Sequence, residues 1–210
     1  MGVQMGALFA THTVQQTVLI AHIWRAPWTF ERFCTKSASE NFSQRIDSVA
    51  TQDRQTITLR ASNEAHSTRI AAALAPHLRA GDIVMLDGAL AAGKTFFTRA
   101  LVGALGSDED VTSPTYTIAN VYETTVAPVL HVDAYRLETA KEFYHLGLDD
   151  YFETGICVIE WGQRIDGFFD APLQIEIGFG ATEDIREFQL SSTDKRWGPV
   201  FEMLMSNADD

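Results

Sequence analysis

The residues with the clearest chemical role occupy positions 88–95, whose sequence GALAAGKT fits the pattern G-x-x-x-x-G-K-[ST]. The apolar run at 83–87 predicts a buried strand before this loop, and residues 93–105 predict a helix after it. Such a loop turns backbone N–H groups toward one anion, Lys94 adds a positive charge, and the Thr95 hydroxyl is a ligand for Mg²⁺. An ordinary glycine-containing turn is the alternative. We favour a nucleotide site because the flanking strand and helix are both predicted.

Two carboxylates follow apolar runs elsewhere in the chain. Residues 129–133 and 156–160 are typical of buried strands, and they end in Asp133 and Glu160. A carboxylate at the end of a buried strand needs a cation or hydrogen-bond donors, so both are candidates to hold Mg²⁺, directly or through water. His131 lies two residues before Asp133 and therefore points to the same side of the strand. A structural and a catalytic role both stay open for His131.

A polar loop follows the helix that begins at the 88–95 motif. Residues 111–117 read Val-Thr-Ser-Pro-Thr-Tyr-Thr. In a phosphate-loop protein, the hydroxyls of a loop after the first helix can reach the γ-phosphate or its attacking water. Such a loop can become ordered or relax when the nucleotide is hydrolysed. A loop that merely leads into the next strand, with incidental hydroxyls, is the alternative.

The remaining elements must position these groups. Alternating or apolar runs predict further strands, and helical spacing predicts further helices. The additional strands are expected at 56–60, 117–122, 173–177 and 185–190, and the additional helices at 62–81, 139–146 and 197–205. This order predicts an α/β fold: a P-loop NTPase-like central mixed sheet flanked by helices, with antiparallel strands at the C-terminal edge.

Composition narrows the class of protein. The 210 residues carry a net charge of −12, so the chain has no overall basic footprint for nucleic acid. No run is long enough for a membrane span, and we expect no membrane partner. Cys157 lies in an apolar strand and is expected to be a buried hydrophobe, whereas Cys34 has a different context, so no disulfide framework is indicated. Together these features indicate a cytoplasmic protein.

We divide the chain near residue 55. Residues 56–210 are expected to form the P-loop ATPase domain. Residues 1–55 are expected to be a poorly ordered extension of unknown role, or to include an upstream start that is not the native one. They lack the basic n-region and cleavage site of a signal peptide, whereas a transit peptide stays open as an alternative.

Four motifs together resemble one family. They are residues 88–95, Ser-Pro-Thr-Tyr-Thr at 113–117, His-Val-Asp-Ala-Tyr-Arg at 131–136, and Glu160-Trp161. Their order and spacing resemble those of the TsaE family, small bacterial ATPases needed to make N6-threonylcarbamoyladenosine (t6A) in tRNA. The resemblance covers about residues 56–200.

The resemblance implies a function for the chain. It implies an ATPase that uses ATP and Mg²⁺ and joins the TsaB–TsaD pair, which transfers threonylcarbamoyl to adenosine 37 of tRNA. ATP binding and hydrolysis would reset that assembly, and tRNA would be contacted only indirectly.

The resemblance also implies roles for individual residues. Thr95 and Glu160 look like the Mg²⁺ ligands, and Thr115 would be the switch hydroxyl. The catalytic residues implied are Lys94, Thr115, Asp133 and Glu160. The ATP-binding residues implied are Glu64, Gly88, Ala89, Leu90, Ala91, Ala92, Gly93, Lys94, Thr95, Asp133, Gln163 and Arg186.

The phosphate loop departs from the family pattern at two positions. The family loop usually reads G-D-L-G-A-G-K-T, whereas this chain has Ala89 and Ala91. Ala91 removes a glycine from a loop that needs a permissive backbone, so we expect nucleotide binding with reduced affinity or turnover.

Three functions stay open from the sequence. The first is a slow ATPase that needs an arginine from a partner or from Arg99, Arg136 or Arg164. The second is a conformational latch driven by ATP binding, with incidental hydrolysis. The third is a small-molecule kinase, which is disfavoured because no arginine-rich lid occurs between Gly106 and Gly180.

Overall fold

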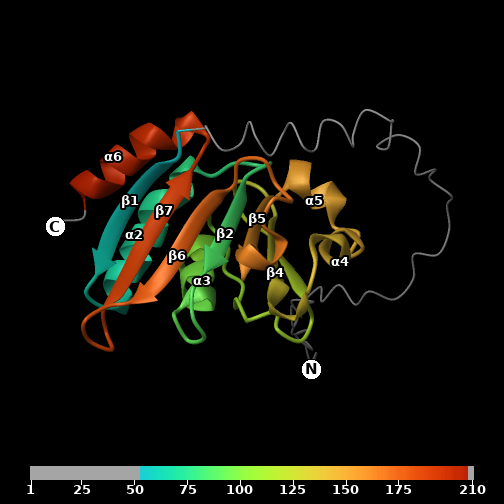
Figure 1. Cartoon of the computed structure of the whole chain (residues 1–210), viewed down its shortest axis with the longest axis horizontal. Helices are drawn as coiled ribbons and strands as arrows, with labels where there is room; N and C mark the ends of the chain where they lie inside the picture. The colour runs from blue at the N-terminus through green and yellow to red at the C-terminus, as the bar shows by residue number, and fades with distance from the viewer. Residues whose placement is uncertain (1–52, 208–210) are drawn as a thin grey trace, which may run out of the picture.

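A seven-stranded mixed sheet organises the computed structural model, which describes residues 53–207 (Figure 1). Its strand order is β1-β7-β6-β2-β5-β4-β3. The strands are β1 Gln55–Ala61, β2 Ile83–Asp87, β3 Ala119–Tyr122, β4 Val129–Asp133, β5 Ile156–Glu160, β6 Leu173–Phe179 and β7 Arg186–Ser192. Strands β6, β2, β5 and β4 are parallel, whereas β7 and β1 continue one edge in antiparallel fashion. The predicted α/β fold with a mixed sheet is confirmed.

The second edge of the sheet was not predicted. There β3 pairs with β4 in antiparallel fashion, so both edges of the sheet carry antiparallel strands. Strand β3 begins at Ala119 rather than at residue 117, because Ile118 has a left-handed backbone with φ of 71°. The division of the chain at residue 55 stays a prediction, since residues 1–52 lie outside the described part.

The helices begin and end close to the predicted positions, with two exceptions. They are α2 Glu64–Leu74, α3 Lys94–Ala104, α4 Ala140–Tyr144, α5 Asp149–Thr154 and α6 Gly198–Ser206, with 3₁₀ turns η2 Ala75–His77, η3 Ala134–Arg136, η4 Gly162–Ile165 and η5 Lys195–Trp197. The predicted helix 62–81 ends early, because Pro76 has no N–H for the next helical hydrogen bond. Helix α5 was missed, because six residues are too short to show a helical period.

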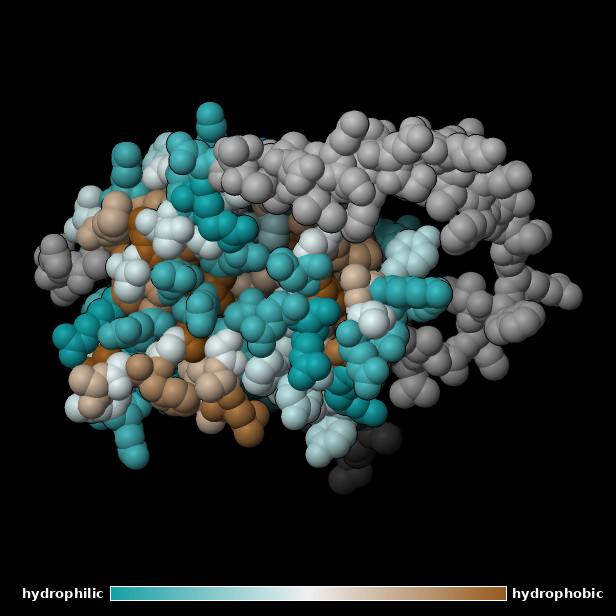
Figure 2. Space-filling model, in the orientation of Figure 1, coloured by the Kyte–Doolittle hydropathy of each residue, from teal (hydrophilic) through white to brown (hydrophobic). Residues whose placement is uncertain are grey.

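The two faces of the sheet are covered unequally. On one face α2, α3 and α6 pack over a core that includes Leu59, Leu101 and Phe188. On the other face, α4, α5 and η4 cover β2, β5 and β4 and part of β3, around Phe143. The same face of β6, β7 and β1 carries polar residues in register and is mostly hydrophilic at the surface (Figure 2). Buried Cys157 belongs to the covered part, and burial raises the pKa of its thiol to about 12, as expected for a small core residue.

The parallel strands bring the predicted chemical groups to one edge. Asp133 and Glu160 are partners across the β4–β5 ladder, and Glu160 is the partner of Leu86 across the β5–β2 ladder. All three strands end at the same side, next to the loop that follows β2. No helix in the described part of the chain is long and apolar enough to cross a membrane.

Candidate nucleotide and metal site

The 88–95 loop has an unusual backbone at three positions. Gly88, Ala91 and Gly93 have φ of 135°, 62° and 108°, all in the region that favours glycine. A Cβ at Gly88 would lie 2.3 Å from the carbonyl oxygen of Ile177, so this position also requires glycine for space. Ala91 is therefore the strained residue of the loop, whereas Ala89 has no positive φ. Of the two departures from the family pattern, the one at Ala91 strains the backbone and the one at Ala89 does not.

Lys94 lies over the loop that it follows. Its Nζ donates hydrogen bonds to the carbonyl oxygens of Gly88 (2.8 Å) and Ala89 (3.0 Å) and lies 3.9 Å from the centroid of the Trp161 ring. Lys94 is only 5% exposed. Burial lowers the pKa of its ammonium, while the carboxylates of Glu160 and Asp133 act in the opposite direction. The cation is therefore held where the phosphates of a nucleotide would lie.

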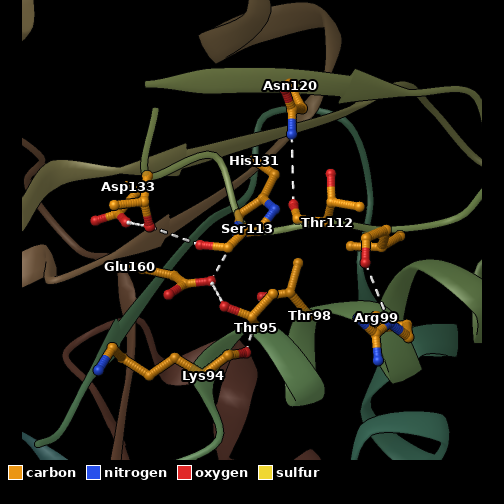
Figure 3. Close-up of polar contacts among 12 residues, drawn as sticks. Lys94, Thr95, Thr98, Arg99, Thr112, Ser113, Asn120, His131, Asp133 and Glu160 are labelled. Carbon is orange, nitrogen blue, oxygen red and sulfur yellow. Dashed lines mark hydrogen bonds and ion pairs between the residues drawn. The ribbon is translucent and has the colours of Figure 1, made fainter. Parts of the chain in front are cut away.

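Glu160 connects the loop to the neighbouring strands (Figure 3). Its Oε1 accepts a hydrogen bond from the Thr95 hydroxyl at 2.7 Å, and the Nε2 atom of His131 lies 2.8 Å from the same oxygen. Glu160 is 3% exposed. Two oxygen groups that can bind Mg²⁺ thus lie in direct contact at the start of α3; their role as metal ligands stays a prediction.

Asp133 lies on the other side of Glu160 and contacts the polar loop. Its Oδ2 accepts a hydrogen bond from the Thr115 hydroxyl at 2.7 Å, and its Oδ1 accepts one from the backbone N–H of Tyr135 at 2.9 Å. The Thr115 hydroxyl also lies 2.8 Å from that of Ser113. The structure therefore brings the candidate switch residue to the candidate metal site.

The start of the polar loop is held by α3 and β3. The Nε of Arg99 donates to the carbonyl oxygen of Val111 at 3.1 Å, and the Tyr122 hydroxyl donates to that of Thr112 at 3.2 Å. Asn120 reaches the same Thr112 oxygen (Figure 3). Beyond this anchor, Tyr116 is almost fully exposed. The anchored start fixes the position from which residues 113–117 reach the site.

One cavity of about 240 Å³ contains the four predicted catalytic residues. Its lining is Leu90, Ala91, Gly93, Lys94, Thr95, Phe96, Ser113, Thr115, Asp133, Glu160 and Trp161. Its carboxylate and hydroxyl oxygens are of the kind that Mg²⁺ prefers. In residues 53–207 no group of three or more His, Cys, Asp or Glu side chains could hold a metal ion. The cavity lining offers two carboxylates, and protein sites usually bind Mg²⁺ through one or two carboxylates together with substrate phosphates.

A second cavity adjoins the loop on the side of β7. This cavity has a volume of about 310 Å³, and Glu64 and Arg186 both line it, together with Ala91, Ala92 and Gly93. The Nε of Arg186 donates a hydrogen bond to the carbonyl oxygen of Ala92 at 2.9 Å. Two predicted nucleotide contacts that are 122 positions apart in the sequence thus meet beside the phosphate loop.

Gln163 is not brought together with Glu64 and Arg186. It lines a third cavity, of about 450 Å³, together with Asp87, Gly88 and Ala89. Its backbone N–H donates to Oδ1 of Asp87 at 3.0 Å. Burial raises the pKa of that carboxyl group, and the N–H of Gln163 partly opposes the effect. The structure therefore gives Gln163 a contact with the strand before the loop.

Comparison with known protein families identifies the family that the four motifs indicated. The family model described as "Threonylcarbamoyl adenosine biosynthesis protein TsaE" matches residues 61–188. The chain belongs to the TsaE family. TsaE is a nucleotide-binding family, and membership places this protein in the biosynthesis of threonylcarbamoyladenosine in tRNA, as the four motifs predicted.

Individual relatives and a solved structure support the family. TsaE of Bacillus subtilis is 37% identical over 147 residues, which cover 69% of this chain and 91% of that protein. TsaE of Treponema pallidum is 45% identical over 89 residues, covering 42% of this chain and 65% of that protein. The crystal structure of Bacillus subtilis YdiB superposes with a TM-score of 0.62 at 31% identity, covering 75% of this chain and 98% of that one.

Two residues of the site were not assigned by sequence reasoning. Trp161 has a left-handed backbone with φ of 60°, and its ring contacts both Lys94 and the ring of Tyr135. The Glu-Trp pair is one of the TsaE motifs, and that was the available signal. His131 contacts Glu160 from a neighbouring strand. The available signals were its shared side with Asp133 and its place in the 131–136 motif.

Proposed function

We propose that this TsaE protein is a slow, Mg²⁺-dependent P-loop ATPase that acts on the TsaB–TsaD pair and contacts tRNA only indirectly. The observation that carries the proposal is the shared cavity beside the 88–95 loop. There Lys94, the Thr95–Glu160 pair and the Thr115–Asp133 pair surround one space. A cation, a hydroxyl and two carboxylates at the start of a helix are the parts that phosphoryl transfer from ATP requires.

The phosphate chain would bind along the loop and at the start of α3. Lys94 already donates two hydrogen bonds in this region, and phosphate oxygens would replace the carbonyl oxygens of Gly88 and Ala89 as acceptors. The adjoining cavity with Glu64 and Arg186 is the proposed place for the rest of the nucleotide. Gln163 is proposed as a more distant contact, through Asp87 and the loop.

Thr95 and Glu160 would hold Mg²⁺. The Thr95 hydroxyl donates a hydrogen bond to Glu160, so a lone pair of the Thr95 oxygen stays available for the ion. Bound Mg²⁺ neutralises charge that develops on the phosphates. Asp133 and Thr115 are proposed to orient the attacking water and to sense the γ-phosphate, because their mutual hydrogen bond lies at the same cavity.

The proposed rate without partners is low. Arg99 is engaged with the carbonyl oxygen of Val111, and Arg164 lies over the ring of Tyr135. Arg136, the third candidate, is exposed in η3. An arginine that stabilises the transition state would then come from Arg136 or from the partner complex. We further propose that the chain acts in the cytoplasm and that residues 56–210 are the ATPase domain.

The test is ATP hydrolysis by the purified full chain, alone and with the TsaB–TsaD pair plus tRNA. We expect slow turnover alone and stimulation by the complex. The variant Lys94→Ala should lose both, because Lys94 supplies the cation in the cavity that Asp133 and Glu160 line. Hydrolysis that is indifferent to the complex would contradict the proposed pathway role. Unchanged ATP affinity in Lys94→Ala would contradict the proposed site.

A further inference from the structure

We propose that His131 is a positioning residue: it fixes the carboxylate of Glu160 so that the Thr95–Glu160 pair can hold Mg²⁺. The inference rests on the proposed function of the site. His131 does not line the cavity itself and is fully buried in the middle of β4. Its influence on a bound nucleotide would therefore pass through Glu160.

The hydrogen bonds on Glu160 explain how this works. A carboxylate only accepts hydrogen bonds, so Nε2 of His131 carries the proton that is shared with Oε1. The Thr95 hydroxyl donates to the same Oε1. Two donors occupy one oxygen and leave Oε2 as the oxygen that can turn to the cavity. If His131 were absent, only the Thr95 hydroxyl would hold the carboxylate, which could then rotate and turn Oε2 away from the cavity.

The second ring nitrogen of His131 lacks a hydrogen-bond partner, which argues against a purely structural role. Its Nδ1 is the one buried side-chain nitrogen or oxygen within residues 53–207 that has no hydrogen-bond partner. An unpaired buried polar atom destabilises a fold. On its own side of the sheet, Val129 and the ladder partner Val158 are fully buried and apolar, so a leucine at position 131 would match these neighbours better. What histidine provides at position 131, and leucine would not, is the hydrogen bond to Glu160.

The test separates metal coupling from nucleotide binding. ADP affinity would be measured by calorimetry in full-length protein, in EDTA and in saturating Mg²⁺, and the ratio of the two dissociation constants gives the metal coupling. Three variants are compared with the wild type: His131→Leu removes the donor, His131→Asn keeps a shorter amide that cannot reach Glu160, and His131→Gln keeps a donor near the position of Nε2. Thermal unfolding of each variant is recorded in parallel.

We expect His131→Leu and His131→Asn to lower the metal coupling about 10- to 100-fold, as loss of a partner behind a metal ligand typically does. His131→Gln should restore most of the coupling. Affinity in EDTA should be the same in all four proteins, measured at a temperature at which each of them is folded.

Two results would overturn the inference. One is wild-type metal coupling in His131→Leu or, if that variant does not fold, equal coupling in His131→Asn and His131→Gln. The other is an equal loss of affinity in EDTA and in Mg²⁺, which would indicate a general collapse of the site. Failure of the wild type to bind ADP at all would instead contradict the proposed function.

Discussion

The two halves of the sheet differ in how they are covered. The covered half, β2, β5 and β4, has helices or turns on both faces, and its strands are nearly continuous apolar runs. The open half, β6, β7 and β1, is covered on one face and alternates between buried and exposed residues. The open half begins at β6, which pairs with β2 in parallel and with β7 in antiparallel fashion. Parallel strands are usually buried on both faces, whereas antiparallel strands can leave one face in water.

This difference in cover determines how strongly water screens the charged side chains of each half. Glu160 and Asp133 end strands of the covered half and are 3% and 5% exposed. Their interactions with Lys94 and a metal ion are therefore weakly screened by water. In the open half, Glu176 and Glu187 are both exposed, so water screens their charges. The open half contributes to the site chiefly through Arg186 at the start of β7.

The largest effect is expected from Glu160→Ala in the covered half. Loss of a metal ligand should lower ATP turnover at least about 100-fold, because metal stabilisation of the transition state is worth several kcal/mol. ADP affinity in EDTA should hardly change. In the assay with TsaB–TsaD and tRNA, an enzyme would lose t6A formation together with turnover. Retained t6A formation without turnover would favour the latch function instead.

Arg186→Ala should have a smaller effect, because it removes one charge-assisted contact beside the loop. We expect nucleotide affinity to fall about tenfold, which corresponds to about 1.4 kcal/mol, in both EDTA and Mg²⁺. Arg60→Ala on the exposed face of β1 removes the same charge away from the loop; it is the matched control and should bind normally. Equal effects of the two variants would contradict the contribution assigned to the open half.

Ala91→Gly should relieve backbone strain in the loop between β2 and α3. The left-handed backbone of Ala91 costs about 1 kcal/mol relative to glycine, so the variant should unfold about 2–4 °C higher. Ala89→Gly is the control at a position without positive φ and should be neutral or slightly destabilising. Nucleotide affinity of both variants would show whether the strain also limits binding. A gain from Ala89→Gly that equals the gain from Ala91→Gly would contradict the assignment of strain to position 91.

The smallest effect is expected from Asp87→Asn at the border between the halves. Burial raises the pKa of Asp87, so the folded state binds its proton more tightly than the unfolded state. The resulting stability is present at acid pH and is lost as pH rises through the folded pKa. Asparagine has no charge to bury and can still accept the N–H of Gln163. Thermal unfolding should show a gain of no more than about 2–4 °C at pH 7 that shrinks toward pH 4. A gain that grows on acidification would contradict the sign.

The sequence alone predicted the elements that carry chemistry. Strands β2, β4 and β5 were predicted with their observed bounds, because each is a short apolar run ending in a carboxylate. The loop motif was legible because its glycines, lysine and threonine are close in sequence and each has a fixed role. The TsaE motifs identified the family for the same reason, since each motif is local.

The tertiary structure decided what depends on distant segments. The placement of β1 beside β7, the second antiparallel edge at β3, and the separation of Gln163 from Glu64 and Arg186 depend on strand pairing. So does the contact between His131 and Glu160. Local residue patterns determine elements, because backbone preferences and hydrophobic periodicity act over a few residues. Contacts between elements depend on packing across the whole sheet, and only the folded chain brings those side chains within hydrogen-bonding distance.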